Sequence, residues 1–194
     1  MAKSSKQWLR RHVTDGYVRK AREHGYRSRA AFKLLEIDER EKLLRPGASV
    51  IDLGAAPGGW SQVAAARVKP GGKVIAIDLL AVEPIPGVIV LKGDFREAAI
   101  DARADVVLCD VSPNISGVRA VDQARSLELA LAAIEFSRAR LAPKGVFLVK
   151  AFHGEAFGEL QAALKEAFTS VKVMKPQASR GESAETYLLA RGPR

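Results

Sequence analysis

The amino-acid sequence predicts an α/β fold in which helices cover both faces of a seven-stranded, mostly parallel sheet. Short runs rich in Val and Ile alternate with amphipathic segments along most of the chain, which is typical of a doubly wound sheet. The last two runs have only a polar loop between them, at residues 175–185, so one antiparallel strand is expected at the C-terminal end. A chain of 194 residues suits one domain with a sizeable core.

Strands are expected where β-branched residues cluster, because such side chains pack well on a pleated surface. These runs cover residues 49–53, 73–78, 88–91, 105–110, 146–152, 171–174 and 186–190. Helices are expected between them, at residues 28–42, 60–68, 96–102, 121–141 and 155–168. Ser28 is placed to cap the first helix, and turns containing Pro and Gly at 45–47, 70–72 and 143–145 lead into strands.

The positive charge is concentrated near the N-terminus. Of the formal net charge of +9, residues 1–33 contribute +8, from ten Lys/Arg against two Asp/Glu. Basic groups interleaved with aromatic ones suit a phosphate backbone and exposed bases, although a solvated basic face would have the same composition. We therefore predict a basic, RNA-contacting arm at residues 1–27 and a single domain at residues 28–194. The candidate RNA contacts are Arg10, Arg11, Arg19, Lys20, Arg27, Arg29 and, in a loop near the C-terminus, Arg180.

Composition excludes several classes of protein. Hydrophobic residues make up 47% of the chain, as in a globular protein, and no apolar run is long enough to span a bilayer. The single cysteine, Cys109, forms no internal disulfide and provides no cluster of metal ligands. We expect a cytoplasmic protein that binds neither a membrane nor a metal, and we expect it to be a monomer.

A glycine-rich loop follows the first expected strand. Residues 52–60 read Asp-Leu-Gly-Ala-Ala-Pro-Gly-Gly-Trp, and glycine allows the backbone to approach a ligand closely. A dinucleotide site has the spacing G-x-G-x-x-G, and this loop lacks the second glycine, which favours S-adenosyl-L-methionine over a nicotinamide cofactor. The loop residues predicted to bind the cofactor are Gly54, Gly58 and Trp60, although Trp60 would also suit helix packing. The alternative is a glycine-rich turn without a ligand.

Four acidic residues end, or closely follow, successive expected strands. They are Asp52, Asp78, Asp94 and Asp110, and strand ends of a parallel sheet share one edge, where ligands bind. Asp78 stands about twenty residues beyond the glycine loop, where an acid grips ribose hydroxyls. Asp94 is placed to accept a hydrogen bond from an adenine amino group. Any one of these acids could be a helix cap or a surface residue, but a shared edge predicts a nucleoside site.

Residues 28–34, 52–62, 93–96, 110–117, 149–152 and 183–187 read SRAAFKL, DLGAAPGGWSQ, GDFR, DVSPNISG, VKAF and SAETY. With these motifs the chain resembles the FtsJ/RrmJ family of ribosomal RNA 2'-O-methyltransferases, from about residue 8 to about residue 190. The resemblance implies a Rossmann-like methyltransferase fold, S-adenosyl-L-methionine as methyl donor, and a uridine ribose of 23S rRNA in the 50S subunit as acceptor. It implies a catalytic tetrad of Lys33, Asp110, Lys150 and Glu185, and cofactor contacts from Gly58, Trp60, Asp78, Asp94 and Asp110.

Two features depart from the family pattern. Val111-Ser112 stands where the family has Met-Ala, and the segment between Asp94 and Asp110 is shorter than usual. Neither departure touches the tetrad. They concern the affinity for the cofactor and the shape of the loop, not the class of reaction.

A ribose 2'-hydroxyl is protonated at neutral pH and is therefore a weak nucleophile. The tetrad would activate it. Lys150 would act either as a general base or, while charged, as a stabiliser of the developing alkoxide during in-line transfer. Asp110 would orient Lys150, and Glu185 would position Lys33. Alternatively, Lys33 is an ordinary helix-surface lysine and Lys150 reaches solvent or pairs with an acid.

Three other functions remain compatible with parts of the sequence. A 2'-O-methyltransferase acting on tRNA or an mRNA cap would share the tetrad. A non-catalytic RNA-binding assembly factor would keep the fold, although the intact tetrad speaks against it. A nicotinamide-dependent dehydrogenase is disfavoured by the glycine spacing.

Overall fold

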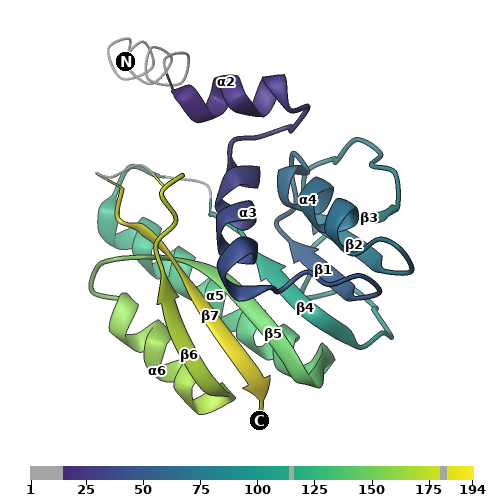
Figure 1. The fold of residues 1–194 in the computed structure, drawn as a ribbon. Helices are drawn as coiled ribbons and strands as arrows, with labels where there is room; N and C mark the ends of the chain where they lie inside the picture. The colour runs from purple at the N-terminus through teal and green to yellow at the C-terminus, as the bar shows by residue number, and fades with distance from the viewer. Residues whose placement is uncertain (1–14, 114–115, 180–182) are drawn as a thin grey trace.

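The computed structural model describes residues 15–113, 116–179 and 183–194, and its centre is one seven-stranded sheet (Figure 1). The strand order is β3-β2-β1-β4-β5-β7-β6, and all neighbouring pairs are parallel except those of β7 with β5 and β6. The predicted α/β class and the antiparallel final strand are confirmed. The strands are β1 (Ser49–Leu53), β2 (Lys73–Asp78), β3 (Val88–Lys92), β4 (Ala104–Cys109), β5 (Leu141–Phe152), β6 (Phe168–Met174) and β7 (Glu185–Pro193).

Helices pack on both faces of the sheet and create two separate cores. On one face, α3 and α4 cover alternate strand residues such as Val50 and Leu148, whereas α5 and α6 cover their neighbours, such as Ile51 and Val149, on the other. This alternation follows from the two-residue period of a strand. The described helices are α2 (Gly16–Glu23), α3 (Ala30–Glu41), α4 (Gly59–Arg67), α5 (Arg119–Arg140) and α6 (Phe157–Ala167).

The helix expected at residues 96–102 is wrong, because this segment forms only a turn followed by irregular chain. Asp94 starts the turn by accepting the Arg96 amide on its side chain and the Glu97 amide on its carbonyl. The buried ring of Phe95 packs edge-on against Phe136 and fixes the turn to the core. A longer helix is not formed, because so short a segment gains few hydrogen bonds for the entropy that helix nucleation costs.

Ser28 does not cap α3, contrary to expectation. The residue before the helix is Arg29, and its side chain makes no capping hydrogen bond. The Ser28 hydroxyl instead fills the space beside Gly59, where the Cβ of any larger residue would lie 2.4 Å from it. Packing of the chain before α3 onto the start of α4 thus takes precedence over capping.

The expected strand at residues 146–152 begins earlier, at Leu141, directly after α5. Leu141 pairs with Ala104 and Val146 pairs with Val106, so residues 142–145 form an irregularity in the strand. Pro143 and Gly145, predicted to form a turn before the strand, instead lie within β5 at this irregularity. None of the helices in the described part of the chain combines the length and the apolar character that a membrane crossing requires.

The predicted arm contains a folded segment. Helix α2 begins after Asp15, which accepts the Tyr17 amide as an N-cap, and the Asp15 carboxylate also pairs with Arg29. Arg27 donates to the carbonyl oxygens of Pro57, Glu83 and Pro84 at 3.3, 2.6 and 2.8 Å. These contacts tie Asp15 and Arg27, which belong to the predicted arm at residues 1–27, to the domain that follows.

Candidate active site

Strand register places Asp110, Lys150 and Tyr187 in one row at the C-terminal edge of the sheet. Cys109 pairs with Val149, so Asp110 follows β4 beside Lys150, and Lys150 pairs with Tyr187 across the antiparallel β5–β7 pair. Directly paired residues of neighbouring strands share a face. Glu185 lies two residues before Tyr187 on the same face of β7, and Lys33 reaches the row from α3.

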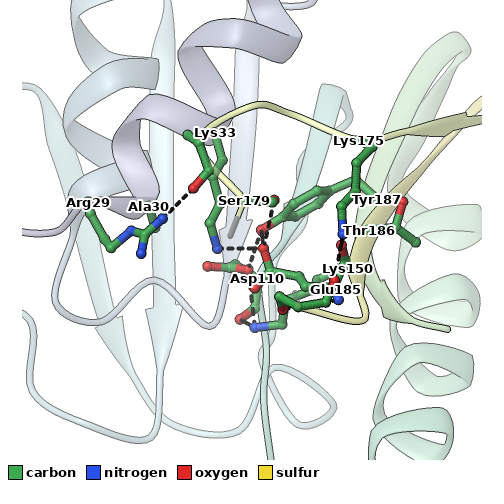
Figure 2. A network of polar contacts seen from close by, with 12 residues as sticks. Arg29, Ala30, Lys33, Asp110, Lys150, Lys175, Ser179, Glu185, Thr186 and Tyr187 are labelled. Atoms are coloured by element: carbon green, nitrogen blue, oxygen red, sulfur yellow. Dashed lines mark hydrogen bonds and ion pairs between the residues drawn. The ribbon is translucent and has the colours of Figure 1, made fainter. Parts of the chain in front are cut away.

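The four predicted catalytic residues come together as two ion pairs (Figure 2). The Lys33 ammonium lies 2.5 Å from Oε1 of Glu185, and the Lys150 ammonium lies 3.1 Å from Oδ1 of Asp110. All four side chains are 8–21% exposed. Both lysines are thus partly withdrawn from water, and each is balanced by a carboxylate.

Tyr187 connects the two ion pairs and was not predicted as a site residue. Its hydroxyl oxygen lies 3.3 Å from Oδ1 of Asp110 and 3.2 Å from Oε1 of Glu185, and the residue is 0% exposed. Residues two apart in a strand lie on the same face, so the position of Tyr187 two residues after Glu185 is the signal that could have revealed it. The five side chains form one continuous polar chain inside the protein.

The charges of the network shift the pKa values of two of its members. Burial alone would raise the pKa of Glu185, but the nearby Lys33 and Lys150 and the hydroxyl of Ser179 lower it below its ordinary value. Burial and then the carboxylates of Asp110 and Glu185 raise the pKa of Tyr187 well above its ordinary value. At neutral pH the site therefore holds an ionised Glu185 and a neutral phenol.

Lys175 and Glu36 tie down described parts of the segment that leads to Glu185. Lys175 donates to the carbonyl oxygens of Ser183 and Glu185 at 2.7 and 2.5 Å. Glu36 of α3 accepts the backbone amides of Gln177 and Ala178 at 2.6 and 3.0 Å. Helix α3 therefore positions Lys33 and also the segment that leads to its partner.

A cleft of about 530 Å³ opens at the ends of β1, β2 and β4, within the size range of ligand pockets. It lies where strand order reverses between β1 and β4, which is the usual ligand position in such sheets. Its wall includes Leu79 and Leu80, which are 66% and 68% exposed. The residues predicted for the cofactor that line it are Gly54, Asp78, Asp94 and Asp110, and Lys150 lies at the same cleft.

Gly54 and Asp78 shape the cleft through their backbones and hydrogen bonds. Gly54 has a φ of +73°, and a Cβ there would lie 2.7 Å from Cγ2 of Val111, so a larger residue would not fit. Asp78 accepts the amides of Ala56 and Leu80 at 2.9 and 2.8 Å. Its carboxylate therefore fixes the glycine loop and the strand end, and still borders the cleft.

Asp94 is held by its neighbour Arg96. The guanidinium lies 2.5 Å from Oδ2 and 3.0 Å from Oδ1, and its hydrogen bond lowers the pKa of Asp94 below the ordinary value. The Arg96 amide also donates to Oδ1 at 2.9 Å. The Asp94 carboxylate therefore accepts more hydrogen bonds from the protein than that of Asp78 does.

Gly58 and Trp60 do not line the cleft. Gly58 has a φ of +114°, and a Cβ there would lie 2.7 Å from Cδ1 of Ile85, so the glycine serves the loop conformation. Trp60 is buried, donates to the carbonyl oxygen of Ala30 at 2.8 Å and packs its ring 5.6 Å from that of Tyr187. Both residues therefore have packing roles in this structure, and their contact with the cofactor stays a prediction.

Asp52 lies beneath the cleft and is fully buried. Its Oδ2 accepts the Ser61 hydroxyl at 2.6 Å, whereas Oδ1 has no partner among the described residues. Burial is the main cause that raises the pKa of Asp52 to about 7, and the charges of Asp110 and Asp78 add to it. Near neutral pH this carboxyl group is therefore partly protonated.

A second pocket of about 230 Å³ borders the other two members of the tetrad. It is lined by Arg29, Lys33, Ser183 and Glu185. The pair Lys33–Glu185 borders this pocket, and the pair Lys150–Asp110 borders the cleft. The network in Figure 2 thus contributes residues to the walls of two openings.

The predicted RNA contacts have different surroundings. Arg10, Arg11 and Arg180 lie outside the described residues. Arg19 is exposed beside Glu23 at 3.7 Å, and Lys20 lies 5.4 Å from the ring centre of Tyr17. The guanidinium groups of Arg27 and Arg29 are bonded to protein oxygens, the latter to Asp15 and the carbonyl of Ala178.

Comparison with known proteins shows the family to which this chain belongs. The chain matches the sequence model of FtsJ-like methyltransferases over residues 26–193. The chain belongs to this family. FtsJ-like relatives named ribosomal RNA large subunit methyltransferase E include that of Azoarcus sp., 53% identical over 96% of both chains, and that of Nitrosospira multiformis, 50% identical over 99% of this chain and 98% of the relative. The predicted resemblance is confirmed.

Solved structures support the same FtsJ-like fold. A ribosomal RNA methyltransferase from Plasmodium falciparum is 30% identical, with a TM-score of 0.77, over 87% of this chain and 98% of that one. Fibrillarin from Aeropyrum pernix, solved with bound S-adenosyl-L-methionine, has a TM-score of 0.61 at 16% identity, over 85% and 75% of the two chains. The second likeness concerns the fold alone.

Proposed function

We propose that this FtsJ-like methyltransferase transfers a methyl group from S-adenosyl-L-methionine to the 2'-oxygen of a uridine ribose in 23S rRNA. This proposal rests on one observation: residues of the tetrad border two openings in the structure. Lys150 and Asp110 border a nucleoside-sized cleft, and Lys33 and Glu185 border a second pocket. A donor in the cleft and a ribose in the pocket would then meet at the two lysines.

The cleft fits the proposed cofactor by its chemistry. Asp78 offers carboxylate oxygens to a ribose diol, and the exposed side chains of Leu79 and Leu80 offer an apolar surface to an adenine ring. Gly54 leaves backbone accessible where a Cβ would collide. When bound, S-adenosyl-L-methionine would supply an electrophilic methyl group on a sulfonium.

Lys150 would stabilise the oxygen that attacks. Its ammonium donates to the carbonyl oxygen of Asp110 at 2.8 Å and pairs with the carboxylate of the same residue, which fixes its direction. An ammonium has three donors, so Lys150 can keep its hydrogen bond to the carbonyl oxygen of Asp110 and turn toward the ribose oxygen, away from the carboxylate. A positive charge that is fixed before the reaction stabilises the developing alkoxide. The proton of the ribose 2'-hydroxyl passes to water.

Lys33 and Glu185 would position the ribose. Glu185 is ionised and held by Lys33 and Ser179, so the pocket wall presents a fixed carboxylate and a fixed ammonium. Both groups hydrogen-bond hydroxyls, and holding the acceptor in line with the methyl group accounts for much of the rate in such a transfer. Lys33 thus acts beside the acceptor and not in the cofactor cleft.

The RNA class is proposed from the relatives, which are named as ribosomal RNA large subunit methyltransferases and match nearly the whole chain. The N-terminal charge supports an RNA partner, and cytoplasmic 50S subunits would be its source. Transfer of labelled methyl groups to large-subunit RNA lacking the modification tests this. Alkaline hydrolysis should leave the label in dinucleotides, because a methylated 2'-oxygen blocks cleavage, whereas label in mononucleotides would indicate base methylation.

A further inference from the structure

The phenol of Tyr187 has an unusual hydrogen-bonding position. It carries one proton, yet its oxygen lies within 3.3 Å of two carboxylate oxygens, Oδ1 of Asp110 and Oε1 of Glu185. A neutral phenol donates fully to only one acceptor at a time. The contact with Asp110 and the contact with Glu185 are therefore alternatives for the same proton.

The two carboxylates differ in their other partners. Glu185 also receives Lys33 and the Ser179 hydroxyl, at 2.5 and 3.1 Å. In the part of the chain that the structure describes, the Asp110 carboxylate has an ion pair with Lys150 and a hydrogen bond from Tyr187, and no other polar partner. If Lys150 turned toward a substrate oxygen, Tyr187 would be the remaining donor to Asp110.

The ring of Tyr187 is held so that its hydroxyl alone is free to turn. It is fully buried, and the Trp60 ring packs 5.6 Å away. Trp60 is itself fixed by its hydrogen bond to Ala30 at the start of α3. Rotation about the C–O bond changes which carboxylate receives the proton without moving any heavy atom.

We propose that Tyr187 is a positioning residue. Its hydroxyl turns from donating a hydrogen bond to Glu185 to donating one to Asp110 when Lys150 binds the ribose oxygen. This inference rests on the proposed methyl transfer. The shift keeps the Asp110 carboxylate hydrogen-bonded while Lys150 redirects a donor, and Glu185 keeps its bonds to Lys33 and Ser179. No proton leaves the phenol, and no bond is formed or broken in it.

The variant Tyr187→Phe removes the hydroxyl and keeps the packed ring. We expect kcat to fall about ten- to a hundredfold, the size of one hydrogen bond to a charged group, with KM for RNA and the Kd of S-adenosyl-L-methionine within about twofold. The acid limb of the kcat profile should move to higher pH, because ionised carboxylates lose a donor. A purely structural role would lower the Tm without this change of profile.

Two matched variants separate the bridge from other effects. Ser137→Ala removes a buried hydroxyl that donates to the carbonyl oxygen of Ala133 within α5, outside the tetrad, and should leave kcat unchanged. Ser179→Ala removes a donor to Glu185 alone and should cost less than Tyr187→Phe. Equal losses and equal pH shifts in Ser179→Ala and Tyr187→Phe, or a wild-type profile in Tyr187→Phe, would overturn the role of Tyr187 while the methyl transfer stands. Lack of 2'-O transfer by the wild type would overturn both.

A spectroscopic measurement tests the bridge without relying on activity or on folding of Tyr187→Phe. The chain has three tyrosines, so Tyr17→Phe with Tyr26→Phe leaves Tyr187 as the single site for 3-fluorotyrosine. We expect its ¹⁹F resonance to move both in Asp110→Asn and in Glu185→Gln. A resonance that responds to only one of these substitutions would contradict the shared proton.

Discussion

The ammonium of Lys150 contacts Asp110 twice, at its carbonyl oxygen at 2.8 Å and at Oδ1 of its carboxylate at 3.1 Å. Both contacts follow from the register of β4 and β5, which places the two residues side by side at the edge of the cleft. A lysine held in this way has a fixed direction before substrate arrives. The first prediction concerns this residue.

Lys150→Ala should reduce kcat by at least about a hundredfold, because it removes the charge that stabilises the developing alkoxide. Calorimetric titration should show S-adenosyl-L-methionine binding within a few fold of the wild type. Lys150→Arg keeps the charge but changes its geometry and should recover only part of kcat. Near-normal turnover of Lys150→Ala would remove the assigned role.

Asp78→Ala should weaken binding of S-adenosyl-L-methionine about ten- to a hundredfold, because the cleft loses a carboxylate that also holds the amides of Ala56 and Leu80. Asp94→Asn is the matched comparison. Its carboxylate is already engaged by Arg96, so we expect less than about a tenfold loss. Losses of equal size in calorimetry would mean that Asp94 contributes as much as Asp78.

Because Asp52 is buried, we expect the free energy of unfolding to depend on pH in an unusual way. Its pKa of about 7 in the folded protein lies above the ordinary value, so between about pH 4 and pH 7 the folded state holds more protons than the unfolded state. The contribution of Asp52 to the free energy of unfolding therefore falls as pH rises through this window. Asp52→Asn has no carboxyl group to titrate at this position and so lacks this decrease. The free energy of unfolding of Asp52→Asn minus that of the wild type should therefore rise by up to about 4 kcal/mol between pH 4 and pH 8.

Urea unfolding at several pH values measures that difference, and any pH-independent cost of the buried amide cancels in it. Asp101→Asn, at an exposed position, is the control and should show no such trend. A constant difference between Asp52→Asn and the wild type would show that Asp52 is ionised throughout.

The N-terminal segment can be tested without disturbing the domain. Deletion of residues 1–14 removes four Lys/Arg and no Asp/Glu, and it keeps Asp15, α2 and Arg27. We expect weaker RNA binding, and a salt dependence whose slope falls by about 0.7 for each phosphate that the shortened chain no longer neutralises. Deletion of residues 1–27 should also lower the Tm, since it removes the hydrogen bonds of Arg27. An unchanged slope in the shorter deletion would count against an RNA-binding arm.

The strands were predictable because their signals are local. β1 and β2 were predicted to the residue, since β-branched runs are bounded by Gly, Pro or Asp, and the polar loop before β7 indicated its direction. The segment after Asp94 was mispredicted as a helix because its outcome depends on burying Phe95 against Phe136, a contact between residues far apart in sequence.

The site was predictable where motifs name residues and unpredictable where packing decides. The tetrad residues and Asp78 were predicted through the resemblance and the strand ends, and the structure brings the tetrad together and places Asp78 at the cleft. Trp60 stands in the same motif as Gly54, but its ring is buried against Tyr187. The roles of Tyr187 and Arg27 depend on strand register and on loop carbonyls, which no local pattern specifies.

Location of the transferred methyl group tests the account most directly. Large-subunit RNA lacking the modification should be incubated with the wild-type protein or Lys150→Ala and with S-adenosyl-L-methionine carrying a deuterated methyl group, then digested to nucleosides for mass spectrometry. We predict deuterated 2'-O-methyluridine with the wild type and none with Lys150→Ala. A deuterated methyl group on a base, or equal 2'-O-methylation by both proteins, would contradict the account.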